Sequence, residues 1–287
     1  MQTNALTTSQ ECAPQGSHIS IRPPRGWSAP NLRDLWRYRE LLLFFTWRDV
    51  KVRYKQTALG ALWAVIQPVL TMVIFSAIFG GIAKLPSDGV PYTIFTYTAL
   101  LPWQLFAFAL TSSGNSLIMN QNLVSKVYFP RLVIPISALL PGLVDFGISF
   151  VVLIVMMMYY HIALTWRVLT LPLFLALALA TAIGVGLWLS AMNVQYRDVR
   201  YAIPFLTTFW QYATPVAYSS DVIPEQWRAL YALNPMTSVV EGFRWALLGG
   251  TAKFDPMMWF SCLMVFVVLV GGLFYFRRME DSFADII

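Results

Sequence analysis

The sequence is poor in charged residues. Only 12% of its 287 residues are Asp, Glu, Lys or Arg, and 57% are hydrophobic, whereas a soluble domain is about 25% charged. A chain of this composition cannot bury its apolar surface in a water-soluble core, so the lipid bilayer must act as the solvent for most of it. The composition therefore predicts an integral membrane protein and excludes an ordinary soluble domain.

Cysteine and histidine are nearly absent. The two cysteines are Cys12 and Cys262, and the two histidines are His18 and His161. Neither pair has the spacing of a disulfide framework or a metal site. The sequence also contains no P-loop, zinc-protease or nucleophile-elbow motif and no D-x-D pair. We therefore predict that the chain is not an enzyme, with no catalytic residue, no metal and no cofactor of its own.

The net charge of +6 does not indicate nucleic-acid binding. Nine of the twenty basic residues lie between Arg22 and Lys55, ahead of the first apolar run, and no nucleic-acid motif accompanies them. A basic segment beside an apolar run is typical of a membrane surface. Membrane lipids, and no nucleic acid, are therefore the expected partners of this charge.

The first thirty residues resemble neither a signal peptide nor a folded unit. They begin without a basic patch and contain no apolar run. Pro14, Pro23, Pro24 and Pro30 are interspersed with Ser, Thr and Gly, a composition typical of unstructured chain. Residues 1–30 are predicted to be a flexible N-terminal extension.

Six apolar runs approach the roughly 20 residues that a helix needs to cross the hydrocarbon. Lys and Arg counts predict their orientation, because basic residues favour the cytoplasmic side. With the N-terminus in the cytoplasm, fifteen basic residues lie on that side and five on the other. Both termini are therefore predicted to be cytoplasmic. The expected spans are Leu59–Ala83, Ile94–Leu117, Leu132–Tyr160, Leu169–Met192, Ala202–Ala217, which is short, and Met257–Phe276.

The basic segment Leu32–Lys55 has the pattern of an amphipathic helix. At 100° per residue its apolar residues, among them Trp36, Leu43 and Trp47, fall within one third of the circumference. Such a helix lies in the membrane plane with its basic side chains among anionic headgroups. The alternative is a cytosolic helix packed on a partner, and the two tryptophans favour the interface.

Packing and chemistry within the spans are also indicated. Rows of small residues at a spacing of four in the fourth span predict close helix contacts, and prolines in the first and third spans predict kinks. Asp145 is the one acid clearly inside a span. Its carboxylate is interpreted either as a functional group or as the structural partner of an arginine or a backbone group. The rows are Ala176, Ala180 and Gly184, and Ala178, Ala182, Gly186 and Ser190; the prolines are Pro68, Pro135 and Pro141.

The segment Asp221–Gly250 predicts two short helices on the outer side. Asn234-Pro235 is a cap followed by proline at the first helical position, and Gly249-Gly250 ends the apolar pattern that follows. Two such helices back to back predict a re-entrant hairpin that enters the outer leaflet and returns. The alternative is a structured outer loop with no gating role.

Aromatic residues make up 15% of the chain. Aromatic faces suit the C–H patches of sugar rings, although most aromatics in membrane proteins face lipid. A polysaccharide channel lined by aromatic side chains is the functional interpretation. Its candidate lining residues are Trp63, Phe75, Tyr97, Phe209 and Tyr212.

Four blocks of sequence resemble the permeases of type-2 ABC exporters for O-antigen, capsule and teichoic acid. The first is Arg48–Lys55 with Gly60–Trp63 and Gln67-Pro68, and the others are Asn122–Arg131, Asn193–Val199 and Leu233–Met236. The resemblance runs from about Leu32 to Arg278. It implies the type-2 ABC exporter fold, with residues 31–287 as one transmembrane domain, and the extension before Pro30 departs from the compact family pattern.

The resemblance also implies partners and sites. Family members are homodimers with two ATPase subunits, which bind the ATP and Mg, and they export a lipid-linked polymer. Residues 120–131 would be the coupling helix that docks on the ATPase, and residues 221–250 would form a periplasmic gate whose apolar faces meet across a dimer axis. The implied coupling residues are Asn122, Lys126, Tyr128, Phe129 and Arg131, and the implied gate residues are Trp227, Tyr231, Val240, Phe243 and Leu247.

One further site follows from charge at the cytoplasmic surface. Arg48, Lys51, Arg53 and Lys55 are candidates for binding the pyrophosphate of a lipid-linked substrate, unless they serve only as an orientation signal. The predicted function is therefore the channel-forming subunit of a polysaccharide exporter in the bacterial inner membrane. The alternatives are a permease for teichoic acid, a drug or a small lipid, and a secondary transporter.

Overall fold

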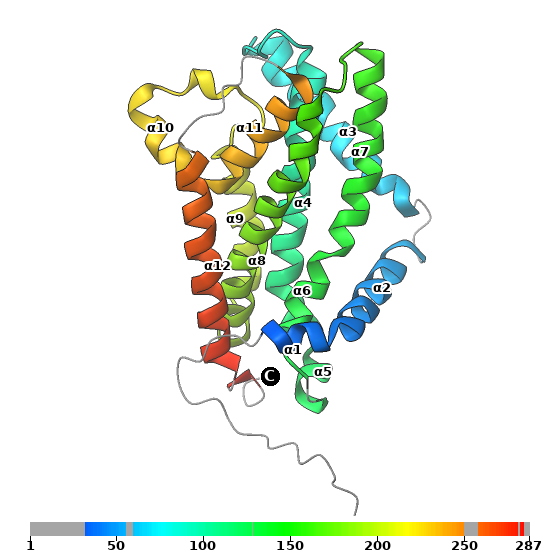
Figure 1. The fold of residues 1–287 in the computed structure, drawn as a ribbon, viewed down its shortest axis with the longest axis vertical. Coiled ribbons are helices and arrows are strands. Elements are labelled where there is room, and N and C mark those ends of the chain that lie inside the picture. The colour runs from blue at the N-terminus through cyan, green and yellow to red at the C-terminus, as the bar shows by residue number, and fades with distance from the viewer. Residues whose placement is uncertain (1–31, 56–59, 128, 250–257, 281, 284–287) are drawn as a thin grey trace, which may run out of the picture.

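In the computed structural model, long helices stand side by side in one elongated bundle (Figure 1). The structure describes residues 32–55, 60–127, 129–249, 258–280 and 282–283, and all regular structure in these ranges is helical. The helices are α1 (Leu32–Arg37), α2 (Arg39–Lys55), η1 (Gly60–Leu62), α3 (Trp63–Phe75), η2 (Ser76–Ile82), α4 (Tyr92–Met119), α5 (Gln121–Lys126), α6 (Val133–Leu139), α7 (Pro141–Tyr159), η3 (Trp166–Thr170), α8 (Leu171–Gln195), α9 (Val199–Tyr212), η4 (Ser220–Val222), α10 (Glu225–Ala232), α11 (Pro235–Leu248) and α12 (Met258–Glu280).

Among the described residues, five helical stretches are long and apolar enough to cross a membrane. Four of them match the predicted first, second, third and fourth spans, and the last matches the predicted sixth. The predicted fifth span, Ala202–Ala217, overlaps α9, which has only 14 residues. At 1.5 Å per residue this helix is about 21 Å long, less than the roughly 30 Å of hydrocarbon, so helix length does not confirm a sixth span. The five stretches are Gly60–Ile82, Tyr92–Met119, Val133–Tyr159, Trp166–Gln195 and Met258–Glu280.

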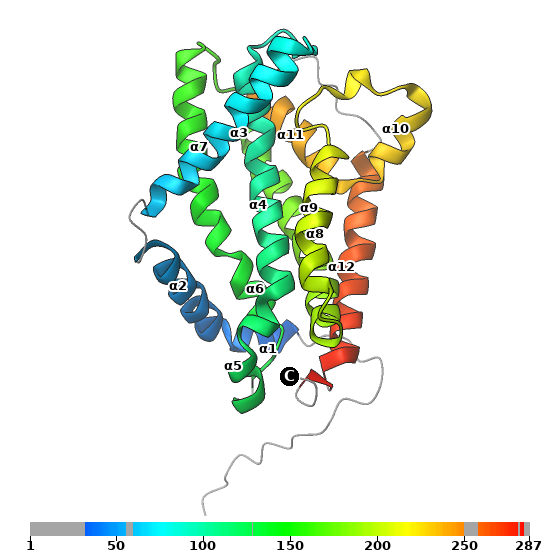
Figure 2. The same cartoon turned by 180° about the vertical axis from the view of Figure 1, so that it is seen from behind.

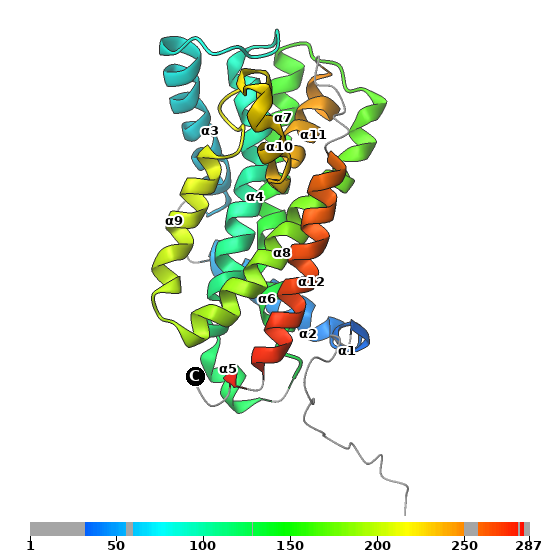
Figure 3. The same ribbon diagram turned by 90° about the vertical axis from the view of Figure 1, so that its left-hand side faces the viewer.

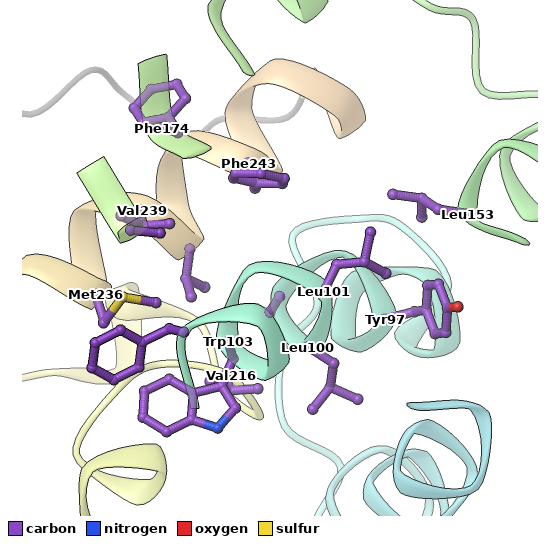
Figure 4. Close-up of a cluster of buried hydrophobic side chains, with 14 of the residues drawn as sticks. Tyr97, Leu100, Leu101, Trp103, Leu153, Phe174, Val216, Met236, Val239 and Phe243 are labelled. Atoms are coloured by element: carbon purple, nitrogen blue, oxygen red, sulfur yellow. The ribbon is translucent and has the colours of Figure 1, made fainter. Parts of the chain in front are cut away.

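The α4 helix forms the centre of the bundle. Most of its 28 residues are buried, and it packs against α3, α6, α7, α8, α9 and α11. Figure 4 shows Tyr97, Leu100 and Leu101 projecting from α4 in different directions, with Phe243 of α11 among the apolar side chains around this helix. A helix that is apolar on every side is expected to be enclosed by protein, and α4 is enclosed by its own chain.

Small residues allow α8 to approach two neighbours closely. A Cβ added at Gly272 of α12 would lie 2.4 Å from the carbonyl oxygen of Gly184, and one added at Gly186 would lie 2.6 Å from the Ser113 hydroxyl of α4. The predicted row from Ala178 to Ser190 is buried throughout. The other row is confirmed at Gly184 only, because Ala176 is exposed.

The helix of the third stretch is interrupted beside one of the prolines for which a kink was predicted. The α6 helix ends at Leu139 and α7 begins at Pro141. Pro68 and Pro135 lie inside helices that continue past them, and the kinks predicted there stay predictions. Further along the first stretch, α3 continues from Ser76 as the π-helix η2.

The predicted amphipathic helix is two helices, interrupted at Tyr38. Trp36, Leu43 and Trp47 on the predicted apolar face are 71%, 62% and 60% exposed. Phe45 lies 200° from Leu43 around the helix axis. It is buried and belongs to a core cluster that also contains residues of α6. The α2 helix therefore has two apolar sides, one packed on the chain and one exposed.

The two ends of the bundle carry different elements. Figures 1 and 2 place α1, α5 and the last turn of α12 at one end, and α10, α11 and η2 at the other. The first described residues and the end of α12 therefore lie at the same end, as the predicted topology requires. Among the basic residues counted as cytoplasmic, Arg277 and Arg278 lie in the last turn of α12, Lys126 lies on α5, and Arg37 lies on α1.

Candidate functional site

The chain between α9 and η4 is irregular. Its backbone carbonyl groups accept hydrogen bonds from side chains of other segments. Asn234 donates to the Ala213 carbonyl at 3.2 Å, and the Tyr92 hydroxyl donates to the Ala217 carbonyl. Arg244 donates to the carbonyls of Val216 at 2.8 Å and Tyr218 at 3.2 Å. Irregular backbone at membrane depth is tolerated only where such groups are satisfied within the protein. This segment is therefore the structured continuation of α9.

Arg244 is a buried cation at the centre of this network. It is 5% exposed, and its guanidinium carbon lies 3.6 Å from the ring centroid of Phe95. Burial lowers the pKa of Arg244 to about 10, although the charges of Glu241 and Asp88 partly oppose this, so the side chain is protonated at pH 7.

Asn234 joins three segments. Its Oδ1 accepts from the backbone N–H of Met236, which caps α11, and from the indole N–H of Trp210 at 2.8 Å. Its Nδ2 donates to the Thr214 hydroxyl at 3.0 Å. The helix that Asn234 caps ends at Gly249 with φ of +64°, as the sequence predicted. The Asn-Pro-Met block therefore connects α11 to the irregular segment.

The five predicted gate residues do not share one surface. Val240, Phe243 and Leu247 on α11 are buried in the core of the chain, and the ring of Phe243 meets that of Phe146 edge to face at 6.1 Å. They cannot also meet a second copy across an axis, so their prediction as a gate seal was wrong. Trp227 and Tyr231 on α10 remain accessible, and Trp227 is 51% exposed.

The predicted coupling segment contains the short helix α5. Asn122 and Lys126 are exposed, and α5 projects from the lower end of the bundle in Figure 3. Phe129 is only 7% exposed and packs edge to face on Phe45 of α2 at 6.0 Å. An exposed aromatic docking residue was expected at Phe129, and this was wrong.

The two remaining predicted coupling residues are Arg131 and Tyr128. Arg131 donates to the backbone carbonyl of Glu280, and its own N–H donates to the Glu280 carboxylate at 3.3 Å. Arg131 therefore links this segment to the end of α12. Tyr128 lies outside the described residues.

The four predicted pyrophosphate-binding residues divide between two sides of α2. Arg48, Lys51 and Lys55 follow one helix face at spacings of three and four, and both lysines are exposed. Arg48 bonds Asp49 at 2.8 Å and the side-chain oxygen of Asn120 at 3.0 Å. Arg53 points elsewhere, so the structure does not bring the four cations together.

Arg53 and Tyr54 connect α2 to Asp145 of α7. Arg53 forms an ion pair with Asp145 at 2.6 Å and lies over the ring of Phe108, while the Tyr54 hydroxyl donates to the other carboxylate oxygen. Burial, and then the bond to Asp145, raise the pKa of Tyr54 to about 12. Asp145 therefore has the arginine partner that its structural interpretation predicts.

The candidate channel aromatics also separate into two groups. Tyr97 is fully buried, and its hydroxyl donates to the Ser149 carbonyl at 3.1 Å, so its prediction as a channel-lining residue was wrong. Trp63, Phe209 and Tyr212 are 53%, 64% and 61% exposed. Phe75 is half-buried and packs against Phe79. The accessible candidates lie on α3 and α9, which border the same side of the bundle in Figure 3.

Residues 40–248 match the family model of the ABC-2 type transporters. This match covers more than half of the chain. The chain belongs to the ABC-2 type transporter family.

Individual ABC-2 relatives match along most of their length. An O-antigen export system permease protein of Klebsiella pneumoniae is 32% identical over 252 residues, which cover 86% of this chain and 95% of that protein. A protein of the same description from Myxococcus xanthus is 29% identical over 88% of this chain and 98% of its own length. A polysialic acid transport protein of Escherichia coli is 23% identical over 82% of this chain and 92% of its own length.

Sequence reasoning missed several residues that position the elements of this ABC-2 domain. Phe45 was overlooked because it lies off the predicted apolar face of α2. Arg244 carried a signal, because an arginine one residue after Phe243 and four after Val240 interrupts an apolar helix face. A cation on such a face needs buried partners, and here backbone carbonyls of the irregular segment supply them.

Proposed function

We propose that the chain is the membrane subunit of an exporter for a lipid-linked polysaccharide of the O-antigen kind. The observation that carries this proposal is the match to O-antigen and polysialic acid transport proteins over 82–88% of the chain. Relatives that transport the two polymers share this whole length, so the common domain is suited to polymer export. In this proposal the chain forms the path for the polymer, and it does not hydrolyse ATP.

Two copies of the chain enclose the path in this proposal. In the part of the chain that the structure describes, the interior of one copy is occupied by α4, most of whose residues are buried. Exposed aromatic side chains on α3 and α9 offer a surface on which sugar rings slide. We therefore assign the channel wall to Trp63, Phe75, Phe209 and Tyr212, facing the same residues of a second copy.

The membrane orientation follows from charge. The end that carries α1, α5 and the last turn of α12 lies in the cytoplasm of a bacterial inner membrane, with both termini there. The α9 helix and its irregular continuation provide the sixth crossing. The exposed Trp36, Leu43 and Trp47 of α1 and α2 lie in the membrane interface, and α10 and α11 form the re-entrant hairpin on the outer side.

A phosphate-bearing substrate head meets the cytoplasmic face at α2. Arg48, Lys51 and Lys55 form a basic face there, and both lysines are exposed. Arg53 is excluded from this role because it is paired with Asp145. ATP and Mg bind the two partner ATPase subunits that dock from this side.

The function is tested by deleting the gene. Loss of the permease is expected to remove the surface polysaccharide and to leave lipid-linked polymer inside the cell, because synthesis continues without an exit. Immunoblotting of whole cells and of fractionated membranes with antibody to the polysaccharide measures both. Complementation with the intact gene is the control. Unchanged surface polysaccharide in the deletion strain would refute polysaccharide export.

The docking of an ATPase is tested at α5. Lys126→Glu with Val127→Asp is expected to lower recovery of the co-expressed ATPase on the tagged permease at least about tenfold, since charged partners are reversed at an exposed, partly apolar site. Lys126 is exposed and Val127 is 53% exposed, so the fold should tolerate both changes. Copurification of the two proteins from detergent measures the effect.

Two control variants complete this test. Arg228→Glu changes an exposed cation at the opposite end of the molecule and should leave ATPase recovery unchanged. Phe129→Ala removes part of the contact with Phe45 and should lower the thermal midpoint instead. Full ATPase recovery by the α5 variant would place the docking surface elsewhere.

A further inference from the structure

A pocket of about 510 Å³ lies at the end of the molecule that carries α10. It is formed by the segment after η2, by η4 and by α10, which project from the bundle in Figure 1. Its described lining residues are Leu85, Tyr218, Val222, Ile223, Pro224, Trp227 and Tyr231. A volume of this size is within the range of small-ligand sites.

Three of the described lining residues are aromatic, two of them tyrosines, and the others are the aliphatic residues Leu85, Val222, Ile223 and Pro224. Trp227 presents an indole that is 51% exposed, and the hydroxyls of Tyr218 and Tyr231 lie 3.0 Å apart. None of the described lining residues is charged. Aromatic faces with phenol groups between them fit a ligand that has apolar C–H faces and hydroxyl groups at its edge, which describes a neutral sugar ring.

The tyrosine pair is held in place by the network around Arg244. The Tyr218 carbonyl accepts from Arg244, and the Tyr218 hydroxyl contacts both the Tyr231 hydroxyl and the Tyr212 carbonyl. Burial raises the pKa of Tyr218 above its usual range, so the hydroxyl remains protonated. A binding surface that is fixed before the ligand arrives loses less entropy on binding. Trp227, on the exposed side of α10, completes the pocket.

We propose that this pocket is a saccharide-binding subsite at the exit of the transport path, which holds one or two sugar units of the emerging polymer. The inference rests on the proposed function, which places α10 on the outer side and a polysaccharide in the path. The subsite lies outside the α3 and α9 surfaces, so it binds the chain after it has left the channel. Its weak, neutral contacts favour repeated capture and release of successive units.

The test uses a photo-cross-linking amino acid in cells that produce the polysaccharide and the complete transporter. One permease variant carries the cross-linker in place of Trp227. The matched control carries it in place of Trp259, an exposed tryptophan at the start of α12 that is 75% accessible and does not line the pocket. After illumination, the permease is purified and blotted for the polysaccharide.

The expected result is a ladder of polysaccharide-bearing permease from position 227, at least about threefold stronger than from position 259. Adding Tyr231→Leu beside the cross-linker should lower the yield about threefold to tenfold, as expected for loss of one aromatic contact. The ladder should vanish in cells that cannot synthesise the polymer. A band from position 227 that contains only lipid or a second permease copy would overturn the subsite, as would equal ladders from the two positions.

The failure of this inference is distinguishable from the failure of the proposed function. If gene deletion leaves surface polysaccharide unchanged, the proposed function fails. If deletion abolishes export, and the Trp227 cross-linker variant restores it without a polysaccharide ladder, only the subsite is overturned.

Discussion

Arg244→Met is expected to lower the stability of the folded permease by about 2–5 kcal/mol, since each buried carbonyl left unpaired costs about 1–3 kcal/mol. The two carbonyls concerned are those of Val216 and Tyr218. Methionine fills much of the same volume over Phe95 but donates no hydrogen bond. For a chain of this size, the change corresponds to a fall in the thermal midpoint of about 5–15 °C. Thermal unfolding of the purified protein in detergent, followed by size-exclusion chromatography, measures it.

The control for Arg244 is Arg228→Met on the neighbouring helix α10. Arg228 is exposed, so this change removes the same charge and should shift stability by less than about 0.5 kcal/mol. Arg244→Lys should be intermediate, because one ammonium group lacks the fork that contacts two carbonyls. Equal thermal midpoints for Arg244→Met and the parent would show that the irregular segment is held by other contacts.

Gly184→Val is expected to separate α8 from α12. A Cβ at Gly184 would lie 2.9 Å from the backbone N and Cα atoms of Leu269, and a backbone cannot rotate away as a side chain can. Overpacking of this kind costs about 1–3 kcal/mol and sometimes more. The loss should appear as a lower thermal midpoint and as cleavage of α12 by added protease at concentrations that leave the parent intact.

Gly147→Val provides a matched control for the glycine change. Gly147 lies on an exposed part of α7, and a Cβ placed there meets no atom within 4 Å. The same substitution therefore adds the same side chain to a membrane helix without a clash. If the two valine variants unfold at the same temperature, the close contact of α8 and α12 contributes nothing to stability.

The sequence predicted the long helices well because their signals are local. The stretches Tyr92–Met119, Trp166–Gln195 and Met258–Glu280 each extend at most four residues beyond the predicted limits, since the length of an apolar run directly reflects the hydrocarbon thickness. The limits of α11 followed from Asn234 and Gly249, whose capping chemistry involves only neighbouring backbone atoms.

The candidate sites were predicted less well, because an apolar face does not reveal what covers it. Phe243 and Phe129 lie in patterns that fit lipid, a second copy or the chain's own core equally well. The structure shows that the chain itself covers both. Arg53 and Asp145 are 92 positions apart in the sequence, and no local pattern could pair them. Burial and long-range partners depend on tertiary packing, which periodicity does not encode.

The filled interior around α4 has a consequence for genetics. If the polymer passes between two copies, as proposed, both copies form each transport path. One inactive copy therefore inactivates the whole path. In a cell that expresses a normal and an inactive allele together, mixed pairs would outnumber fully normal ones. Inactivating alleles that still fold and pair should therefore be dominant, whereas alleles that prevent folding should be recessive.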